Sequence, residues 1–105
     1  MAHKFIYTSP KDVLSPKDWI SDLKVIYDGG ATGFSIATMK WKNEQVLGIR
    51  WNLSMREYSD PNKQNGVVPC HGMPMSYTHP VWFILPHLSQ CPPDVQNIIH
   101  KYLKF

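Results

Sequence analysis

The sequence predicts an α+β domain in which three or four mainly antiparallel strands form a sheet, a C-terminal helix packs on one face, and a short helix lies near the N-terminus. Two neighbouring segments in the middle of the chain alternate between apolar and polar residues, as half-buried strands do. The last dozen residues carry apolar side chains at helical spacing. A chain of 105 residues is too short for two cores, so residues 1–105 form a single domain.

The N-terminal helix is expected to begin at Ser15-Pro16-Lys17-Asp18. Ser15 is a suitable N-cap, and proline is favoured at the first helical position. Trp19 and Leu23 would then pack inward. Val25 to Tyr27 predicts a short strand, which the turn-forming Asp28-Gly29-Gly30 ends.

A hairpin is the clearest element in the sequence. Residues 34–41 and 45–55 are both strand-like, and an even-numbered loop from Lys42 to Gln45 is expected to join them. We expect the apolar residues of both strands to share the core face, because a shift by one residue would reverse every side chain. That core face comprises Phe34, Ile36, Thr38, Ile49, Trp51 and Leu53.

The opposite face of this hairpin is expected to be polar and solvated. The expected pairing sets Ser35 beside Asn52, Ala37 beside Arg50, and Met39 beside Gly48. Small side chains thus flank the arginine.

The remainder of the chain divides into a loop, a strand and a helix. Glu57 to Pro80 has loop composition throughout, and Val81 to Leu85 predicts a strand that is apolar on both faces. Pro92-Pro93-Asp94 opens the last helix. The apolar stripe of that helix, which we expect to pack on the sheet, comprises Val95, Ile98, Ile99, Tyr102 and Leu103.

Charge and cysteine content constrain the partner and the compartment. The net charge is +3, and the whole basic surplus lies after Asp28, which suits a weak anionic partner but not a dedicated duplex binder. The longest apolar run, Val81 to Leu85, is far shorter than the roughly 20 residues that a membrane-spanning helix needs, so no membrane span is expected. Only Cys70 and Cys91 are present and no signal peptide is evident, so two reduced thiols and a cytoplasmic location are expected.

One cluster of residues could bind metal or carry out catalysis. It comprises Cys70, His71, His79, His87 and Cys91. Their spacing lacks the paired CxxC or HxxxH pattern of structural zinc sites, and no nucleophile motif surrounds Cys70. We therefore expect no metal, no cofactor and no catalytic residues, and a small metal-dependent enzyme built on this segment is kept as an alternative.

The polar hairpin face is the leading candidate site. Cationic and aromatic side chains on an antiparallel sheet suit single-stranded nucleic acid, because bases stack on rings while Lys and Arg neutralise the phosphates. The candidate binding residues are Arg50, Asn52, Lys40, Trp41, Arg56 and Tyr77. The favoured class is a non-catalytic binding or accessory protein that uses this face together with the proline-rich loop, residues 57–80.

A protein partner is the other candidate. Aromatic residues make up 12% of the chain, and several aromatic and methionine side chains fall in irregular segments, as they do at interfaces. These include Trp41, Tyr58, Met73, Met75 and Tyr77. Alternatively, the long loop folds back and buries Met73, Met75 and Tyr77 in a small core of its own, and a homodimer is compatible with both interpretations.

Two strand motifs carry a family resemblance. The motifs Leu47-Gly48-Ile49-Arg50-Trp51-Asn52 and Pro80-Val81-Trp82-Phe83-Ile84-Leu85-Pro86 resemble an "LGIRWN" strand and a "P-x-W-F-x-L-P" strand in a group of small, functionally uncharacterised bacterial proteins. The resemblance covers Phe34 to Pro86 and implies a bacterial origin and a strand-loop-strand arrangement. Relatives often have Ser-Arg-Gly where this chain has Ser76-Tyr77-Thr78, so no functional residue is carried over.

Overall fold

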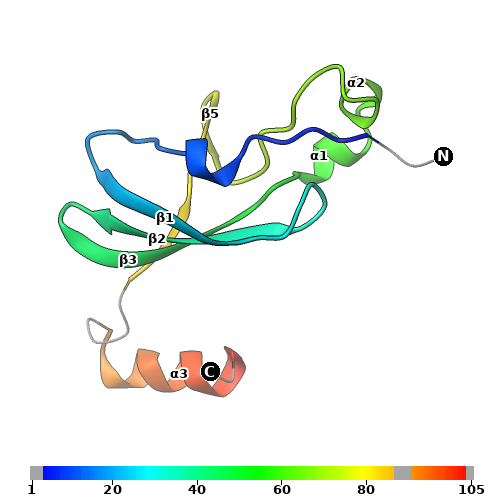
Figure 1. Cartoon of the computed structure of the whole chain (residues 1–105). Coiled ribbons are helices and arrows are strands. Elements are labelled where there is room, and N and C mark those ends of the chain that lie inside the picture. Colours follow the sequence, from blue (N-terminus) through cyan, green and yellow to red (C-terminus); the bar gives the residue numbers. More distant parts are fainter. Residues whose placement is uncertain (1–3, 87–90, 104–105) are drawn as a thin grey trace.

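The computed structural model describes residues 4–86 and 91–103 and confirms the α+β class (Figure 1). Its main sheet is antiparallel with strand order β1-β2-β3-β6, formed by β1 (Ile20–Asp28), β2 (Phe34–Trp41), β3 (Glu44–Trp51) and β6 (Phe83–Leu85). A small hairpin pairs β4 (Met75–Ser76) with β5 (His79–Pro80). The helices are the 3-10 turn η1 (Pro10–Asp12), α1 (Met55–Tyr58), α2 (Pro61–Gln64) and α3 (Pro93–Leu103).

The central hairpin has a two-residue turn. Lys42 and Asn43 both have positive φ, 49° and 71°, as the favoured hairpin turns require. The even-numbered loop is therefore confirmed, but it is tighter than predicted. Trp41 pairs with Glu44, so Ser35 lies opposite Arg50 instead of Asn52, and the whole register is displaced by two residues.

The hydrophobic core lies on the other side of the sheet from the one predicted. The buried residues are Val13, Ile20, Ala37, Met39, Val46 and Trp82. Trp82 anchors the N-terminal segment over this side, because its indole Nε1 donates to the carbonyl of Val13 at 2.8 Å. A Cβ at Gly48 would lie only 2.5 Å from Met39 Cε. Because glycine has no side chain, the core side chains pack directly on the strand at this position. Small residues let the core approach the sheet.

The short N-terminal helix is present as a 3-10 turn, but its predicted start at Ser15 is wrong. Residues 16–19 form a single turn, in which the amides of Trp19 and Ile20 donate to the carbonyl of Pro16, and the chain then enters β1. Among the described residues before β1, the short helix is η1. β1 pairs with β2 from Ile20 to Asp28, with two irregularities in register, and this pairing outweighs the local helix signal.

The segment 57–80, predicted to be loop, contains local structure. Ser54 and Glu57 form a capping box at the start of α1, and the Asp60 side chain accepts from the amide of Asn62 at the start of α2. β3 ends at Trp51 and not near Met55, which lies in α1. Leu53, predicted to face the core, is buried.

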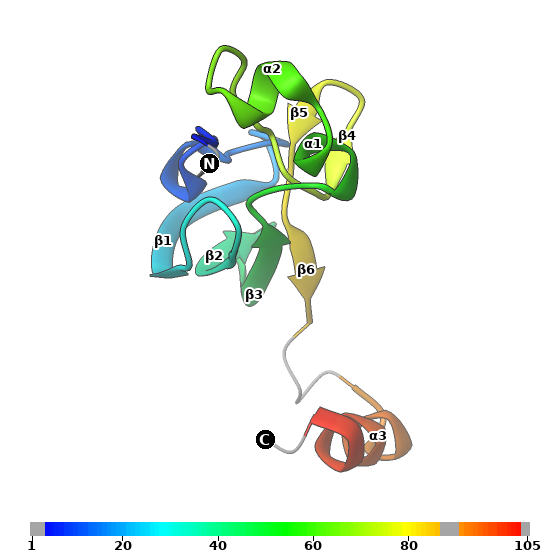
Figure 2. The same ribbon diagram turned by 90° about the vertical axis from the view of Figure 1, so that its right-hand side faces the viewer.

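The C-terminal helix forms where the sequence predicts it. Both views place α3 beyond the end of β6, apart from the strands, on the opposite side of the sheet from η1 (Figures 1 and 2). Ile98 and Tyr102 on its apolar stripe are 54% and 70% exposed. The expected packing of this stripe on the sheet is therefore not seen in this structure. Within residues 4–86 and 91–103, no helix has the length and apolar character needed to cross a membrane.

Candidate binding surface

The side of the sheet that faces away from η1 carries exposed aromatic rings from all four strands. Tyr27, Phe34, Trp51 and Phe83 are 48%, 40%, 55% and 58% exposed. The rings of Tyr27 and Phe34 lie 5.1 Å apart, and those of Phe34 and Trp51 lie 5.8 Å apart in an edge-to-face arrangement. We call these four residues, with Ile49, the open face.

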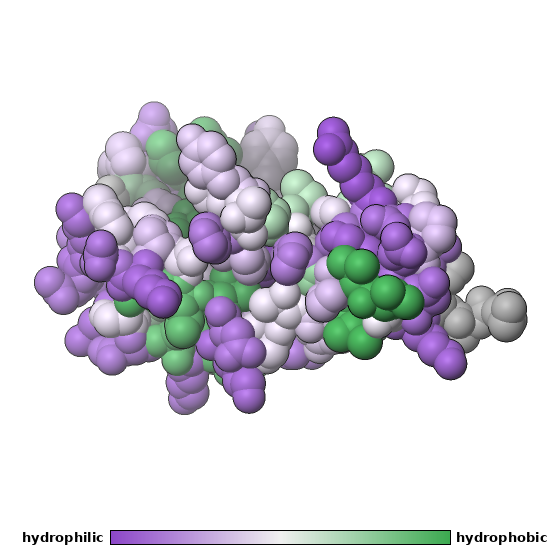
Figure 3. Space-filling model, turned by 90° about the horizontal axis from the view of Figure 1, so that it is seen from above, coloured by the Kyte–Doolittle hydropathy of each residue, from purple (hydrophilic) through white to green (hydrophobic). Residues whose placement is uncertain are grey.

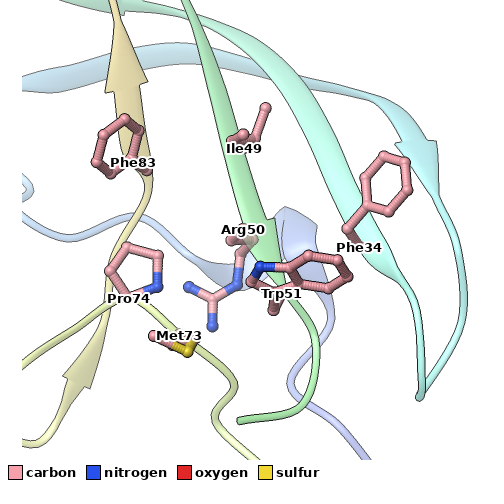
Figure 4. A pocket seen from close by; sticks show the side chains of 7 residues that line it. All are labelled: Phe34, Ile49, Arg50, Trp51, Met73, Pro74 and Phe83. Atoms are coloured by element: carbon pink, nitrogen blue, oxygen red, sulfur yellow. The ribbon is translucent and has the colours of Figure 1, made fainter. Parts of the chain in front are cut away.

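A pocket of about 530 Å³ lies within this surface (Figure 4). Figure 4 shows Phe34 and Trp51 on one side of it and Phe83 and Pro74 on the other, with Met73 between them. Its lining residues are Phe34, Ile49, Arg50, Trp51, Met73, Pro74 and Phe83. By contrast, the η1 side of the molecule is largely hydrophilic and its apolar areas are separated from each other (Figure 3).

Met73 reaches the pocket because the proline-rich loop returns beside the end of β3. The amide and carbonyl of Met73 pair with the carbonyl and amide of Trp51 at 3.0 and 2.9 Å, which extends the antiparallel ladder by one residue. Gly72, with φ of 69°, makes this approach feasible, because a Cβ there would overlap the Trp51 carbonyl oxygen. The open face is therefore formed by the sheet and the loop together.

Arg50 lies beneath this surface and does not project into solvent. Its side chain is on the η1 side of β3, the residue is only 3% exposed, and its guanidinium donates to the carbonyls of Val81 and His71. Burial lowers the pKa of Arg50 to about 10, an effect that the charge of Glu57 partly opposes. Arg50 therefore connects β3 to His71 within the proline-rich loop and to Val81 directly after it.

Asn52 is also buried, at 2% exposure. Its Nδ2 donates to the carbonyl of Gly30 at 2.8 Å, and its Oδ1 accepts from the Ser35 hydroxyl at 2.8 Å. The prediction that Arg50 and Asn52 project from a solvated polar face is therefore wrong. Both polar groups are inside because backbone carbonyls and a neighbouring hydroxyl provide their hydrogen bonds.

Glu57 is also a buried polar residue, although the sequence predicts that it lies in a loop. Its carboxylate accepts from the amides of Ser54, His71 and Gly72 at 2.8 to 2.9 Å and from Lys63 Nζ at 2.7 Å. Burial alone would raise its pKa, but these hydrogen bonds outweigh burial and lower the pKa to about 2. The spacing of Ser54 and Glu57 was the available sequence signal, since it is that of a capping box.

The other predicted binding residues are not brought together. Lys40 is exposed and lies 3.5 Å from the carboxylate of Asp22. Trp41 packs against Trp19 at 5.2 Å between ring centroids, on the core side of the sheet. Arg56 is exposed on α1, and Tyr77 is 99% exposed at the turn between β4 and β5.

The cysteine and histidine segment does not form a metal site among the described residues, which include no group of three candidate ligands. His87 lies outside the described residues. Cys70 is fully buried, and burial raises the pKa of its thiol to about 11. His71 Nδ1 lies 3.3 Å from the Thr8 hydroxyl, so its ring is directed to that residue. Because it is buried and mostly protonated at neutral pH, the Cys70 thiol is a poor nucleophile.

Comparison with known proteins yields no relative: no family model, no curated protein and no solved structure matches the chain. The resemblance to small bacterial proteins stays a prediction.

Proposed function

We propose that this protein is a non-catalytic protein-interaction module whose open face binds the apolar side of an amphipathic helix. The observation that carries the proposal is the exposure of Phe34, Trp51 and Phe83 around one pocket on an uncovered side of the sheet. Contiguous exposed apolar surface of this kind is typical of interaction sites. Helix-in-groove recognition uses apolar anchors at helical spacing, which such a pocket accommodates.

The chemistry of the lining favours an apolar partner over a charged one. The only charged residue that lines the pocket, Arg50, is buried and already donates to two carbonyls, and Lys40 lies close to Asp22. A surface of aromatic rings and aliphatic side chains gains most from burying apolar area. Binding through it should depend little on salt.

Single-stranded nucleic acid is the second candidate, and one observation favours it. The rings of Tyr27, Phe34 and Trp51 form a row across three neighbouring strands, an arrangement on which successive bases can stack. Such binding would weaken steeply with salt because phosphates release counterions. The cytoplasmic location and the bacterial origin stay part of the proposal as predictions from the sequence.

A titration separates the two candidates. A fluorescein-labelled, 14-residue helix designed from Leu, Gln and Glu is titrated with the protein and followed by anisotropy, next to a scrambled-order peptide of the same composition and single-stranded DNA. We expect binding of the helix at low and high salt alike, weakened about tenfold or more by Trp51→Ala and by Phe83→Ala. Tyr77→Ala, on the exposed hairpin turn, serves as the matched control and should bind normally.

Two results would contradict the proposal. If only the DNA binds and its affinity falls with salt, the nucleic-acid candidate is correct. If the scrambled peptide binds as well as the helix, the open face recognises no helical arrangement of side chains.

A further inference from the structure

Helix α3 provides a segment of the kind that the open face should bind. Val95, Ile98, Ile99 and Tyr102 recur at spacings of three and four residues, which places them along one side of the helix. Ile98 and Tyr102 are more than half exposed and Val95 and Ile99 are partly exposed, so the described residues leave most of this stripe uncovered. An isolated helix of 11 residues is only marginally stable in water, and packing of its apolar side is the usual source of stability.

The position of α3 favours docking on another molecule. Figures 1 and 2 both show the helix extending away from the four strands, on the same side of the sheet as the open face. Pro86 ends the described part of the sheet domain, and Pro92 and Pro93 stand at the start of α3, where a proline fixes its own φ and suits the first helical turn. A terminal helix that lies apart from its own sheet is the kind of element that domain-swapped dimers exchange.

We propose that the chain forms a symmetric dimer in which α3 of each copy docks its apolar stripe on the open face of the other. This inference rests on the proposed function, since it names a second copy as an occupant of the same face. In the dimer, Ile98 and Tyr102 contact the rings of Trp51, Phe34 and Phe83.

Symmetry doubles the buried surface. Stable interfaces bury about 1,600 Å² in total, which is more than a single short helix on a sheet supplies. Reciprocal docking creates two equal contacts, and it removes both apolar surfaces from water at once. In the symmetric pair α3 and the open face of both copies are occupied, so no further copy can add.

Sedimentation velocity of the full chain over a concentration series tests the dimer. We expect a monomer-dimer equilibrium whose Kd rises about 30-fold or more in Ile98→Asp and in Trp51→Asp. Asn97→Asp, on the opposite side of α3, is the matched control and should leave Kd unchanged. Ile98→Ala keeps a strong helix former at this position, so a weaker effect of the same sign separates lost docking from lost helix.

Mixing identifies the arrangement. Ile98→Asp keeps its open face and Trp51→Asp keeps its helix stripe, so a mixture of the two should form a heterodimer that neither variant forms with itself.

Three results would overturn the inference: a wild-type protein that stays monomeric at every concentration, a dimer that is insensitive to both substitutions, or a monomer in which Ile98→Asp shifts the NMR signal of the Trp51 indole. The last would show that α3 docks on its own sheet.

The designed helix distinguishes the inference from the proposed function. Suppose that the wild-type protein is monomeric and that Ile98→Asp still binds the peptide in a manner that depends on Trp51. The dimer is then refuted, and the helix-binding function is not. If the dimer forms as described but the peptide never binds, only the general helix-binding function fails.

Discussion

Phe34 and Trp51 are direct cross-strand partners whose rings meet edge to face, with centroids 5.8 Å apart, on the side of the sheet that faces away from η1. The next pair along the same strands, Ser35 and Arg50, is buried on the other side. At these two pairs the hairpin exposes its aromatic residues and buries a small and a polar one. This inversion determines which residues are available for binding and which maintain the fold.

Arg50→Ala should destabilise the fold and not merely weaken binding. The substitution leaves the carbonyls of Val81 and His71 without their donor inside the protein, so we expect the free energy of unfolding to fall by about 3 kcal/mol or more. Urea unfolding measures this change. Arg56→Ala, an exposed position on α1, should change stability by about 0.5 kcal/mol or less. Equal effects of the two substitutions would contradict the structural role of Arg50.

The stability of the protein should depend on Glu57 at acid pH. Its carboxyl pKa is about 2 in the folded protein, below its ordinary value of 4.5. A lowered pKa adds stability above the unfolded value, and this contribution is lost as pH falls from 4.5 through about 2. The loss amounts to about 3 kcal/mol, from about 1.36 kcal/mol for each pKa unit.

Urea unfolding across this pH range tests the prediction with Glu57→Gln. The variant should be less stable at neutral pH and should lack this part of the acid dependence, because its amide does not titrate. An unchanged acid profile in Glu57→Gln would show that other carboxylates control the transition.

Two glycine substitutions separate backbone strain from close packing. Gly72 and Gly30 both have positive φ, 69° and 85°, but a Cβ on Gly30 meets no atom within 4 Å. Gly30→Ala should therefore lower the free energy of unfolding by only about 1 to 2 kcal/mol. Gly72→Ala should cost several kcal/mol more, since its Cβ would overlap the Trp51 carbonyl oxygen and the Arg50 guanidinium. Thermal unfolding compares them, and similar melting temperatures would contradict the described approach of the loop to β3.

The two cysteines should differ sharply in reactivity. Cys70 is fully buried and the pKa of its thiol is raised to about 11, whereas Cys91 is partly exposed. At pH 8 only about one in a thousand Cys70 thiols is ionised, so a thiol reagent should modify Cys91 first and Cys70 only after unfolding. Mass spectrometry of the modified peptides identifies each site. Rapid labelling of Cys70 in the native protein would reopen its role as a nucleophile.

The sequence predicted the positions of the secondary-structure elements better than it predicted which face of the sheet is buried. The alternation in β2 and β3 correctly grouped Phe34 with Trp51 on one face, because residue spacing alone determines which side chains share a face. It did not identify the core face, because the largest apolar residues were assumed to be inside. The core instead requires its side chains to pack closely against the sheet. Ala37 and Gly48 allow this close packing, whereas a side chain as large as that of Trp51 would prevent it.

Apart from the capping-box spacing of Ser54 and Glu57, local pattern does not reveal the buried polar groups. Arg50, Asn52 and Glu57 have partners in segments up to 31 residues away, and for Arg50 and Glu57 these include the backbone of His71 in the proline-rich loop. The small residues around Arg50 were the one local sign that the arginine side of the hairpin packs against other structure. The same long-range contacts create the pocket, since Met73 and Pro74 reach the open face through them.

The most direct test of the central claim, that the open face is the binding surface, is a titration of the ¹⁵N-labelled protein with the designed amphipathic helix, followed by NMR. The account predicts that the largest shift changes occur at the Trp51 indole and at the amides of Phe34, Ile49 and Phe83. Changes confined to Arg56, Lys63 and the Tyr77 turn, with the Trp51 indole unmoved, would contradict it.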